Sequence, residues 1–242
     1  VLASITELMT AAEEFDANTN TTLSRPSFAE TDNVAEFLSR YSDVAYDSVP
    51  RPRNQLPVEH ADSITSLAVG ESYGPYKHGD TYKVSRLMDY KKDGSVRARH
   101  ILVAYEGAER AASTVTRTKE EARVKARELL AKARGTEVAF AQLATEESDG
   151  PTASRGGDLG YFLNGDMVDA FNNYAFSNPI GAIGLVETSF GFHVVKVEDK
   201  RDVYQVATLV RNIEPSEATI NKLYTDATTF EMKTKDSDWK QF

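Results

Sequence analysis

The chain has 242 residues, and 40% of them are hydrophobic, a composition that supports one large or two small domains with a buried core and excludes wholesale disorder. Its 37 acidic and 28 basic residues give a formal charge of −9, which disfavours nucleic acid and anionic membranes as partners. Cysteine is absent, which excludes disulfides, thiolate nucleophiles, zinc–thiolate sites and iron–sulfur clusters.

The two ends of the sequence look incomplete. It begins at Val1 and not at methionine, and its last residues resemble an unfinished helix. No apolar run approaches the roughly 18 residues of a transmembrane helix, and no charged-then-apolar signal segment opens the chain. We therefore expect a piece of a longer protein and no membrane contact by this piece, whereas an anchor or signal could lie outside it.

The first part of the chain predicts short elements. Ser4 and Glu7 stand at capping-box spacing, and the apolar residues after them predict an amphipathic helix that reaches Phe15. The next predicted elements are a helix over 33–40, a proline-rich loop over 46–57, a turn of helix over 62–69 and a strand over 81–87.

A strand predicted over 96–105, bounded upstream by an Asp-Gly turn at 93–94, precedes the clearest helix. Thr118 and Glu121 form its capping box, and Gly135 supplies its stop. One face of this helix is basic, but acidic residues interrupt it, so we interpret it as solvated and not as a nucleic-acid site. The later predicted elements are a helix over 138–147, a polar loop over 148–157, a strand over 159–162, a helix over 167–176, a turn-prone stretch over 181–191 and a strand over 192–197.

The order of sequence features over 140–199 is loosely repeated over 37–89. Each stretch carries a Phe and a Ser-Asp pair before a helix, and then two glycines, a turn and a strand. The first stretch is shorter and has no counterpart to the Gly156-Gly157-Asp158 corner. Two interpretations stay open, a degenerate duplicate that has lost its chemistry and a chance similarity between two α+β segments.

Four ordered blocks of the second half carry a family resemblance. They are VRARHILV at 96–103, SRGGDLGYF at 154–162, GDMVDAF at 165–171 and TSFGFHVVKV at 188–197. Together they resemble a parvulin-type peptidyl-prolyl isomerase. The resemblance implies an α+β fold over 93–201, in which helices surround an antiparallel, FKBP-like sheet.

The resemblance also frames the rest of the chain. Residues 1–92 are then expected to form a smaller α+β segment, either a degenerate parvulin-like repeat or a chaperone-associated segment. Residues 202–242 are expected to form a linker strand and helix leading to an absent domain. The whole arrangement resembles the periplasmic chaperone-isomerases of the SurA and PpiD types. This likeness implies a periplasmic or other extracytoplasmic location, with an inner-membrane anchor in the full-length protein as one option.

Isomerisation needs no covalent step. Rotation about an X–Pro bond faces a barrier of about 18–20 kcal/mol, and a catalyst need only bind the twisted amide better than the planar isomers. Met167 and Phe171 stand four positions apart, a spacing that by itself predicts two residues of the hydrophobic core. The sequence blocks around them favour a place in the substrate pocket instead. The resemblance implies a proline pocket formed by Leu159, Met167, Phe171 and Phe190.

The resemblance implies polar roles as well. His100 and His193 are expected side by side in a supporting network and not as acid and base, because the reaction moves no net proton. Asp149 is expected beside the rotating amide, and a simple turn residue is its alternative interpretation. Thr188 and Ser189 are expected to supply hydroxyl groups to the same network. The residues expected to serve backbone geometry are Gly156, Gly157, Asp158 and Gly191.

Several functions are disfavoured by the pattern of residues. The four histidines are isolated, and no Gly-x-Ser-x-Gly or phosphate-binding loop occurs, so we expect no metal and no cofactor. In 104–113, Arg110 stands alone among acidic neighbours Glu106 and Glu109, which favours unphosphorylated X–Pro bonds of unfolded polypeptides as substrates. The alternative is a non-catalytic chaperone module that binds peptides on the same fold.

Overall fold

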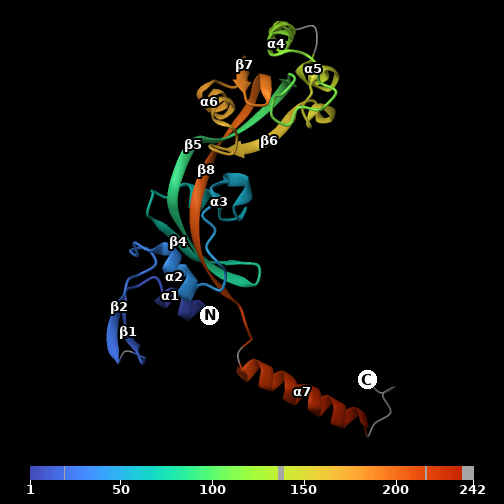
Figure 1. Cartoon of the computed structure of the whole chain (residues 1–242). Helices are drawn as coiled ribbons and strands as arrows, with labels where there is room; N and C mark the ends of the chain where they lie inside the picture. Colours follow the sequence, from blue (N-terminus) through green and yellow to red (C-terminus); the bar gives the residue numbers. More distant parts are fainter. Residues whose placement is uncertain (19, 136–138, 216, 236–242) are drawn as a thin grey trace. The chain divides into compact units, whose positions relative to one another are not determined.

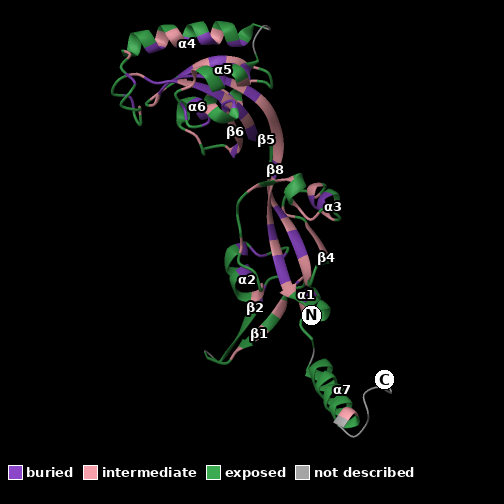
Figure 2. Cartoon of the chain, turned by 90° about the vertical axis from the view of Figure 1, so that its right-hand side faces the viewer, coloured by how far each residue is buried: buried purple, intermediate pink, exposed green. Residues whose placement is uncertain are grey.

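The computed structural model describes residues 1–18, 20–135, 139–215 and 217–235 of the chain (Figure 1). It divides into two compact units. The first unit comprises Val1–Ser48, Ser66–Met88 and Val206–Phe242, and the second comprises Val49–Thr65 and Asp89–Gln205. Two long strands, β5 (Thr81–Val103) and β8 (Gly191–Asn212), contribute residues to both units. Their buried positions stand out in Figure 2.

An antiparallel sheet forms the centre of the second unit. Strand β6 (Asp158–Leu163) pairs with β5, β5 neighbours β8, and β7 (Ile183–Thr188) pairs with β8. Three helices pack against this sheet, namely α4 (Lys119–Arg134), α5 (Phe140–Glu147) and α6 (Asp169–Ser177). The predicted α+β class with an antiparallel sheet flanked by helices is therefore confirmed.

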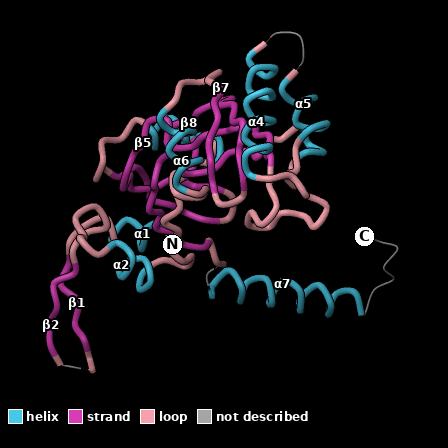
Figure 3. Tube along the Cα trace, turned by 45° about the horizontal axis from the view of Figure 1, so that its top comes forward, coloured by secondary structure: helices cyan, strands magenta, loops and turns pink. Residues whose placement is uncertain are grey.

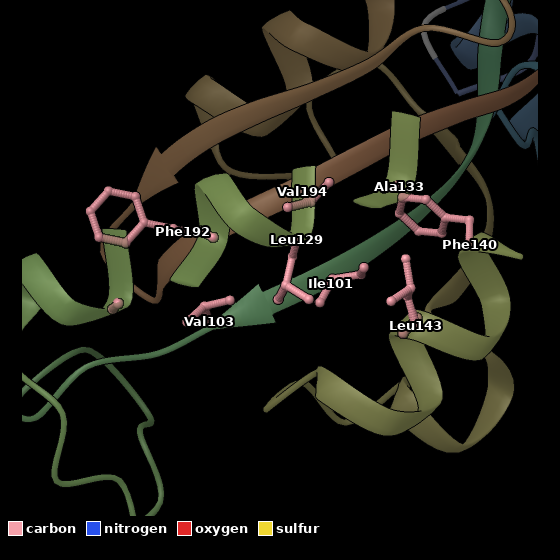
Figure 4. Packing of buried hydrophobic residues seen from close by; sticks show 11 residues of the cluster. Ile101, Val103, Leu129, Ala133, Phe140, Leu143, Phe192 and Val194 are labelled. Carbon is pink, nitrogen blue, oxygen red and sulfur yellow. The ribbon is translucent and has the colours of Figure 1, made fainter. Parts of the chain in front are cut away.

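The core of the second unit lies on both faces of its sheet. Ile101 and Val194 pack with Leu129 of α4 and Leu143 of α5 on one face (Figure 4). Residues one position away along the strands, such as Val195, belong to a separate cluster with α6. Because side chains alternate between the faces of a strand, β5 and β8 present apolar residues to helices on both sides.

The second unit also contains shorter elements. They are β3 (Arg51–Pro52), which pairs with β8, the 3-10 helices η1 (Arg53–Gln55) and η2 (Ala153–Arg155), and α3 (Ala61–Thr65). Most of the predicted proline-rich loop over 46–57 is irregular, as expected, apart from β3 and η1.

The first unit is assembled from segments that are far apart in sequence. Its elements are α1 (Leu2–Glu7), β1 (Ala12–Asp16), β2 (Thr21–Arg25), α2 (Val34–Tyr41), β4 (Ser72–His78) and α7 (Glu217–Lys235). Phe28 and Leu38 pack with Val84 of β5 and Leu209 of β8 in one buried cluster. Its α2 is the predicted second helix, and the side chain of Asn33 caps it by accepting the N–H of Glu36.

The predicted amphipathic helix that reaches Phe15 is wrong beyond its first turns. Helix α1 ends at Glu7 and has no side-chain cap, and Phe15 lies on β1, paired with Thr22 of β2 and 65% exposed. Figure 3 shows the two strands side by side as a hairpin. Asn20 adopts a φ of 53°, a left-handed turn conformation that asparagine tolerates, so turn chemistry outweighs the helical spacing.

The strands predicted over 81–87 and 96–105 are a single strand, because the Asp-Gly pair between them does not end it. Asp93 has a φ of 53°, and its N–H donates to the carboxylate of Asp202 at 2.9 Å. A Cβ on Gly94 would lie 2.5 Å from Val203. The pair is thus held against β8 as an irregularity within β5 and not as a turn.

The later elements match the predictions with shifted bounds. The capping box of α4 is present, α5 begins at Phe140 while its predicted start at 138 lies outside the described residues, and α6 begins at Asp169 and not at 167. The turn-prone stretch over 181–191 contains β7. None of the helices in the described part of the chain combines the length and apolar character needed to span a bilayer.

The C-terminal strand is part of the sheet. Strand β8 continues to Asn212, and Ala207 and Leu209 are fully buried in the first unit. The limits predicted after residues 92 and 201 therefore do not coincide with those of the two units. The degenerate repeat within 1–92, and a further domain after 242, stay predictions.

Candidate active site

A cavity of about 400 Å³ opens in the second unit. Its walls come from the end of β5 and the loop after it, the segments around α6, and the turn between β7 and β8. The predicted residues that line it are Leu159, Met167, Phe171, Phe190, His100, His193 and Asp149. The structure thus brings together the four predicted apolar residues and three of the five predicted polar ones at the pocket surface.

Phe171 connects the apolar wall to the floor. It is only 3% exposed on the first turn of α6 and meets both imidazoles edge-on, with ring centroids 5.8 Å from His100 and 5.6 Å from His193. Met167 precedes the helix, whose N-cap is Val168. The argument from helical spacing of Met167 and Phe171 is therefore wrong, although both side chains line the same pocket.

The two histidines form the middle of a hydrogen-bonded chain. Their rings are stacked, with an interplanar angle of 13°, and their Nδ1 atoms are 3.1 Å apart. Outside the pair, His100 Nε2 contacts Thr152 Oγ1 at 3.0 Å, and His193 Nε2 contacts Thr188 Oγ1 at 2.8 Å. Because every link needs one donor and one acceptor, all hydrogens in the chain are oriented in the same direction.

Burial makes both imidazoles weak bases. It lowers the pKa of His100 to about 4, and burial followed by the neighbouring His100 lowers the pKa of His193 to about 3. Both rings are 7% exposed or less. They are therefore neutral at neutral pH and present a polar, uncharged floor to the pocket.

Asp149 is fixed at the edge of the pocket. Its carboxylate accepts the N–H of Ala104 at 2.9 Å and both terminal nitrogens of Arg117, and its own N–H donates to the carbonyl of Leu102. Arg117 also donates to the Ala104 carbonyl at 3.1 Å. The guanidinium thus compensates the charge of Asp149 and ties it to the end of β5.

Three site features differ from the sequence-based expectation. Ser189 does not join the histidine chain, since its hydroxyl donates to Glu109 at 2.7 Å. Thr152 and Arg117 do belong to the polar network, and sequence reasoning missed both. Neither stands in a periodic pattern, and the only available signal was the polar composition of the loop over 148–157 that contains Thr152.

The glycine corner at 156–157 lies against the first histidine. Gly156 and Gly157 have φ values of 64° and 74°, and the N–H of His100 donates to the Gly157 carbonyl at 3.0 Å. Arg97, assisted by Arg99, holds Asp158 by ion pairing and keeps the pKa of that carboxyl at about 2. The corner therefore fixes the strand that carries His100.

Gly191 makes a similar close approach where β8 begins. Its φ is 131°, and a Cβ there would lie 2.5 Å from the carbonyl oxygen of Val103. This contact brings the start of β8 against the end of β5, two residues before His193. The glycine corner at 156–157 and Gly191 therefore together control the distance between the two histidines.

Replacing Gly157 with alanine is expected to destabilise the protein by about 3 kcal/mol, because the Cβ would lie 2.2 Å from the His100 carbonyl oxygen at a left-handed φ. Gly160→Ala is the matched control. Gly160 has a φ of 71° but open space around its Cβ position, so only the backbone cost of about 1 kcal/mol is expected. Urea unfolding of both variants measures the difference, and equal losses would contradict the steric argument.

The arrangement of the pocket suits the binding of an apolar group and the polarisation of an amide beside it. An apolar cup lies over neutral imidazoles, with the charge-compensated carboxylate of Asp149 at its edge, and the lining also includes Glu109, Arg110 and Asp166. No three His, Asp or Glu side chains among the described residues gather as they would to hold a metal ion. Such a site can hold an apolar ring and surround the amide next to it with fixed polar groups.

Comparison with known proteins gives concordant matches. A family model described as the PPIC-type PPIase domain matches residues 82–201. The chaperone SurA of Alkalilimnicola ehrlichii is 34% identical over 160 residues, which are 63% of this chain and 35% of that protein. The peptidyl-prolyl cis-trans isomerase pin1 of Schizosaccharomyces pombe is 40% identical over 106 residues, which are 42% of this chain and 61% of that protein.

Among solved structures, the solution structure of TbPIN1 is similar at 30% identity and a TM-score of 0.40, over 44% of this chain and 98% of that one. The chain spans little more than a third of the length of the curated chaperones that it matches.

Proposed function

Since residues 82–201 belong to the PPIC-type PPIase domain family, the parvulins, we propose that the chain is a peptidyl-prolyl cis–trans isomerase that acts on X–Pro bonds without covalent chemistry. The observation that carries the proposal is the apolar cup seated on a buried, neutral histidine pair. Leu159, Met167, Phe171 and Phe190 supply the apolar surface for a pyrrolidine ring.

The catalytic effect follows from differential binding. The ground-state amide is planar, and twisting it removes the conjugation that makes up the barrier of about 18–20 kcal/mol. A pocket can bind the pyrrolidine ring while its fixed dipoles stabilise the carbonyl and nitrogen of the twisted amide. Such a pocket lowers the rotation barrier without proton transfer. His100 and His193 support the cup and orient its polar floor, and Asp149 acts electrostatically beside the amide.

The substrates follow from the likeness to chaperones. Segments of the chain resemble the chaperone SurA and a foldase protein PrsA of Exiguobacterium sibiricum, the latter 46% identical over 66 residues. We therefore propose unfolded, proline-containing polypeptides outside the cytoplasm as clients, with the periplasm as the specific location. The pairing of Asp149 with Arg117 supports unphosphorylated substrates, since that guanidinium is already occupied by a carboxylate.

The test is a protease-coupled isomerisation assay on an Ala-Ala-Pro-Phe peptide. The parent chain is expected to accelerate the slow phase, and Met167→Ala is expected to lower kcat/KM about 10-fold because a half-buried wall of the cup is lost. Arg127→Ala, on the exposed side of α4, is the control and should match the parent. A parent rate equal to the uncatalysed rate would leave a peptide-binding role without isomerisation.

A further inference from the structure

A largely buried arginine stands next to the first histidine and outside the pocket. Arg99 directly precedes His100 on β5, and its side chain is 19% exposed. Because successive side chains of a strand point to opposite faces, Arg99 lies on the sheet face of Ile101, which packs against α4 and α5. Arg99 is not among the residues that line the cavity, so it can affect the reaction only through other groups.

The guanidinium of Arg99 holds the end of a short helix. Its Nη1 donates to the carbonyl of Arg155 at 3.2 Å and to that of Gly156 at 3.1 Å, where η2 ends. The last carbonyls of a helix have no partner within the helix, and a nearby guanidinium can supply their hydrogen bonds. A Cβ on Gly156 would lie 3.0 Å from this Nη1, so the glycine leaves the space that the guanidinium occupies.

Two carboxylates on the flanking strands fix Arg99 in turn. Its Nε donates to Glu198 of β8 at 2.9 Å, and its Nη2 donates to Asp158 of β6 at 3.3 Å. The side chain of Glu198 is only 20% exposed. A planar guanidinium can serve two carboxylates and two carbonyls at once, because its five donors point outward in a fixed fork. A lysine, with a single nitrogen, cannot replace it in all four contacts.

The loop that Arg99 holds contacts His100 at both of its ends. Thr152 Oγ1 lies 3.0 Å from His100 Nε2, and the Gly157 carbonyl accepts the N–H of His100 at 3.0 Å. Within the loop, the Thr152 carbonyl accepts the N–H groups of Arg155 and Gly157, each at 2.9 Å. The two ends are therefore tied to one another, and fixing the carbonyls of Arg155 and Gly156 also fixes the Thr152 hydroxyl.

We propose that Arg99 is a positioning residue for isomerisation, which acts through the loop over 152–157 to keep the Thr152 hydroxyl on His100. The inference rests on the proposed isomerase function. Every link of the histidine chain shares one direction, so a hydroxyl fixed at its end also fixes which ring nitrogens of His100 and His193 carry hydrogens. Because both imidazoles are neutral, these tautomers determine the dipoles that the polar floor presents to the amide.

The experiment combines kinetics with NMR on Arg99→Lys, which keeps the positive charge but not the fork. Its kcat on the Ala-Ala-Pro-Phe peptide is expected to fall about 10-fold while KM stays within about twofold, since the apolar cup is unchanged. In long-range proton–nitrogen spectra at neutral pH, His100 of the parent should show one protonated and one unprotonated ring nitrogen. In the variant the two nitrogen shifts should approach each other, because the tautomers interconvert once Thr152 is no longer fixed.

Lys196→Gln is the matched control. Lys196 is the other cation beside Glu198, at 3.4 Å, and no contact joins it to the loop over 152–157 in the described part of the chain. This variant should keep the kcat and the histidine nitrogen shifts of the parent. An equal loss of kcat in Lys196→Gln would overturn the positioning role, because the charge around Glu198 would then account for the effect.

The remaining outcomes separate the two proposals. A folded Arg99→Lys with the parent's kcat, or with a lower kcat but unchanged nitrogen shifts, would overturn the positioning role. If Arg99→Lys does not fold, Glu198→Gln, which weakens the hold on Nε, must show both changes to a smaller degree or the role is wrong. A parent without isomerase activity would instead overturn the isomerase function, while the nitrogen shifts would still report whether Arg99 fixes the tautomers.

Discussion

Replacing Phe171 with alanine is expected to lower kcat/KM for X–Pro isomerisation by about 100-fold, which would make it the most damaging single change in the apolar cup. The side chain lines the pocket and meets both imidazoles edge-on, so its loss removes the surface under the pyrrolidine ring and the packing that orients the histidines. Phe171 is also buried in the core beneath α6, and its truncation should cost about 3–5 kcal/mol of folding free energy.

A matched variant separates the catalytic loss from the folding loss. Phe162 is 5% exposed, packs against Phe171 with ring centroids 6.2 Å apart, and does not line the pocket. Phe162→Ala should therefore cost a similar folding free energy while kcat/KM falls less than 10-fold. Both variants are assayed at low temperature, after circular dichroism has established that they are folded. Equal losses of kcat/KM in the two would mean that Phe171 acts only through stability.

The site residues that could be predicted from the sequence share one property. Apart from Asp149, they stand in contiguous blocks, so that Leu159 and the glycine corner, or Phe190 and His193, identify one another through their neighbours. Thr152 and Arg117 complete the polar network from irregular segments, where no periodicity marks a hydrogen-bond partner. Ser189 shows the converse, because its place beside Thr188 implied a role that its contact with Glu109 does not support.

The fold was predictable where local signals decide it. The capping box of α4 and the Asn33 cap of α2 lie within a few residues of the helices that they start. The first unit was not predictable, because its core joins Val84 to Leu209 across more than a hundred residues. Strand β7 was missed for a different reason. Gly184 lies in the stretch predicted to be turn-prone, but it is part of β7 and is needed there because the hydroxyl oxygen of Tyr174 lies 2.4 Å from the position of a Cβ.

Lowering the pH from 6.5 to 5 is expected to reduce the free energy of unfolding by about 3 kcal/mol through the histidine pair. The pKa values of His100 and His193 are about 4 and about 3 in the folded chain, against 6.5 for an ordinary histidine. At pH 6.5 each histidine of the unfolded chain is half protonated and at pH 5 it is almost fully protonated, whereas the folded chain stays largely unprotonated at both positions. Each histidine therefore removes about 1.1 kcal/mol per pH unit on average over this interval as the pH falls.

Other groups whose pKa values are shifted titrate outside the interval from pH 6.5 to 5. The pKa of Asp158 is held at about 2 by Arg97, so its stabilising contribution is complete above about pH 4 and is lost only at lower pH. Urea unfolding followed by circular dichroism at pH 6.5, 5.75 and 5 gives the slope. His100→Gln/His193→Gln, which keeps polar side chains at both positions but cannot titrate, should lose most of that slope. If the double variant keeps the parent's slope, the buried histidine pair is not what couples the stability of this fold to pH.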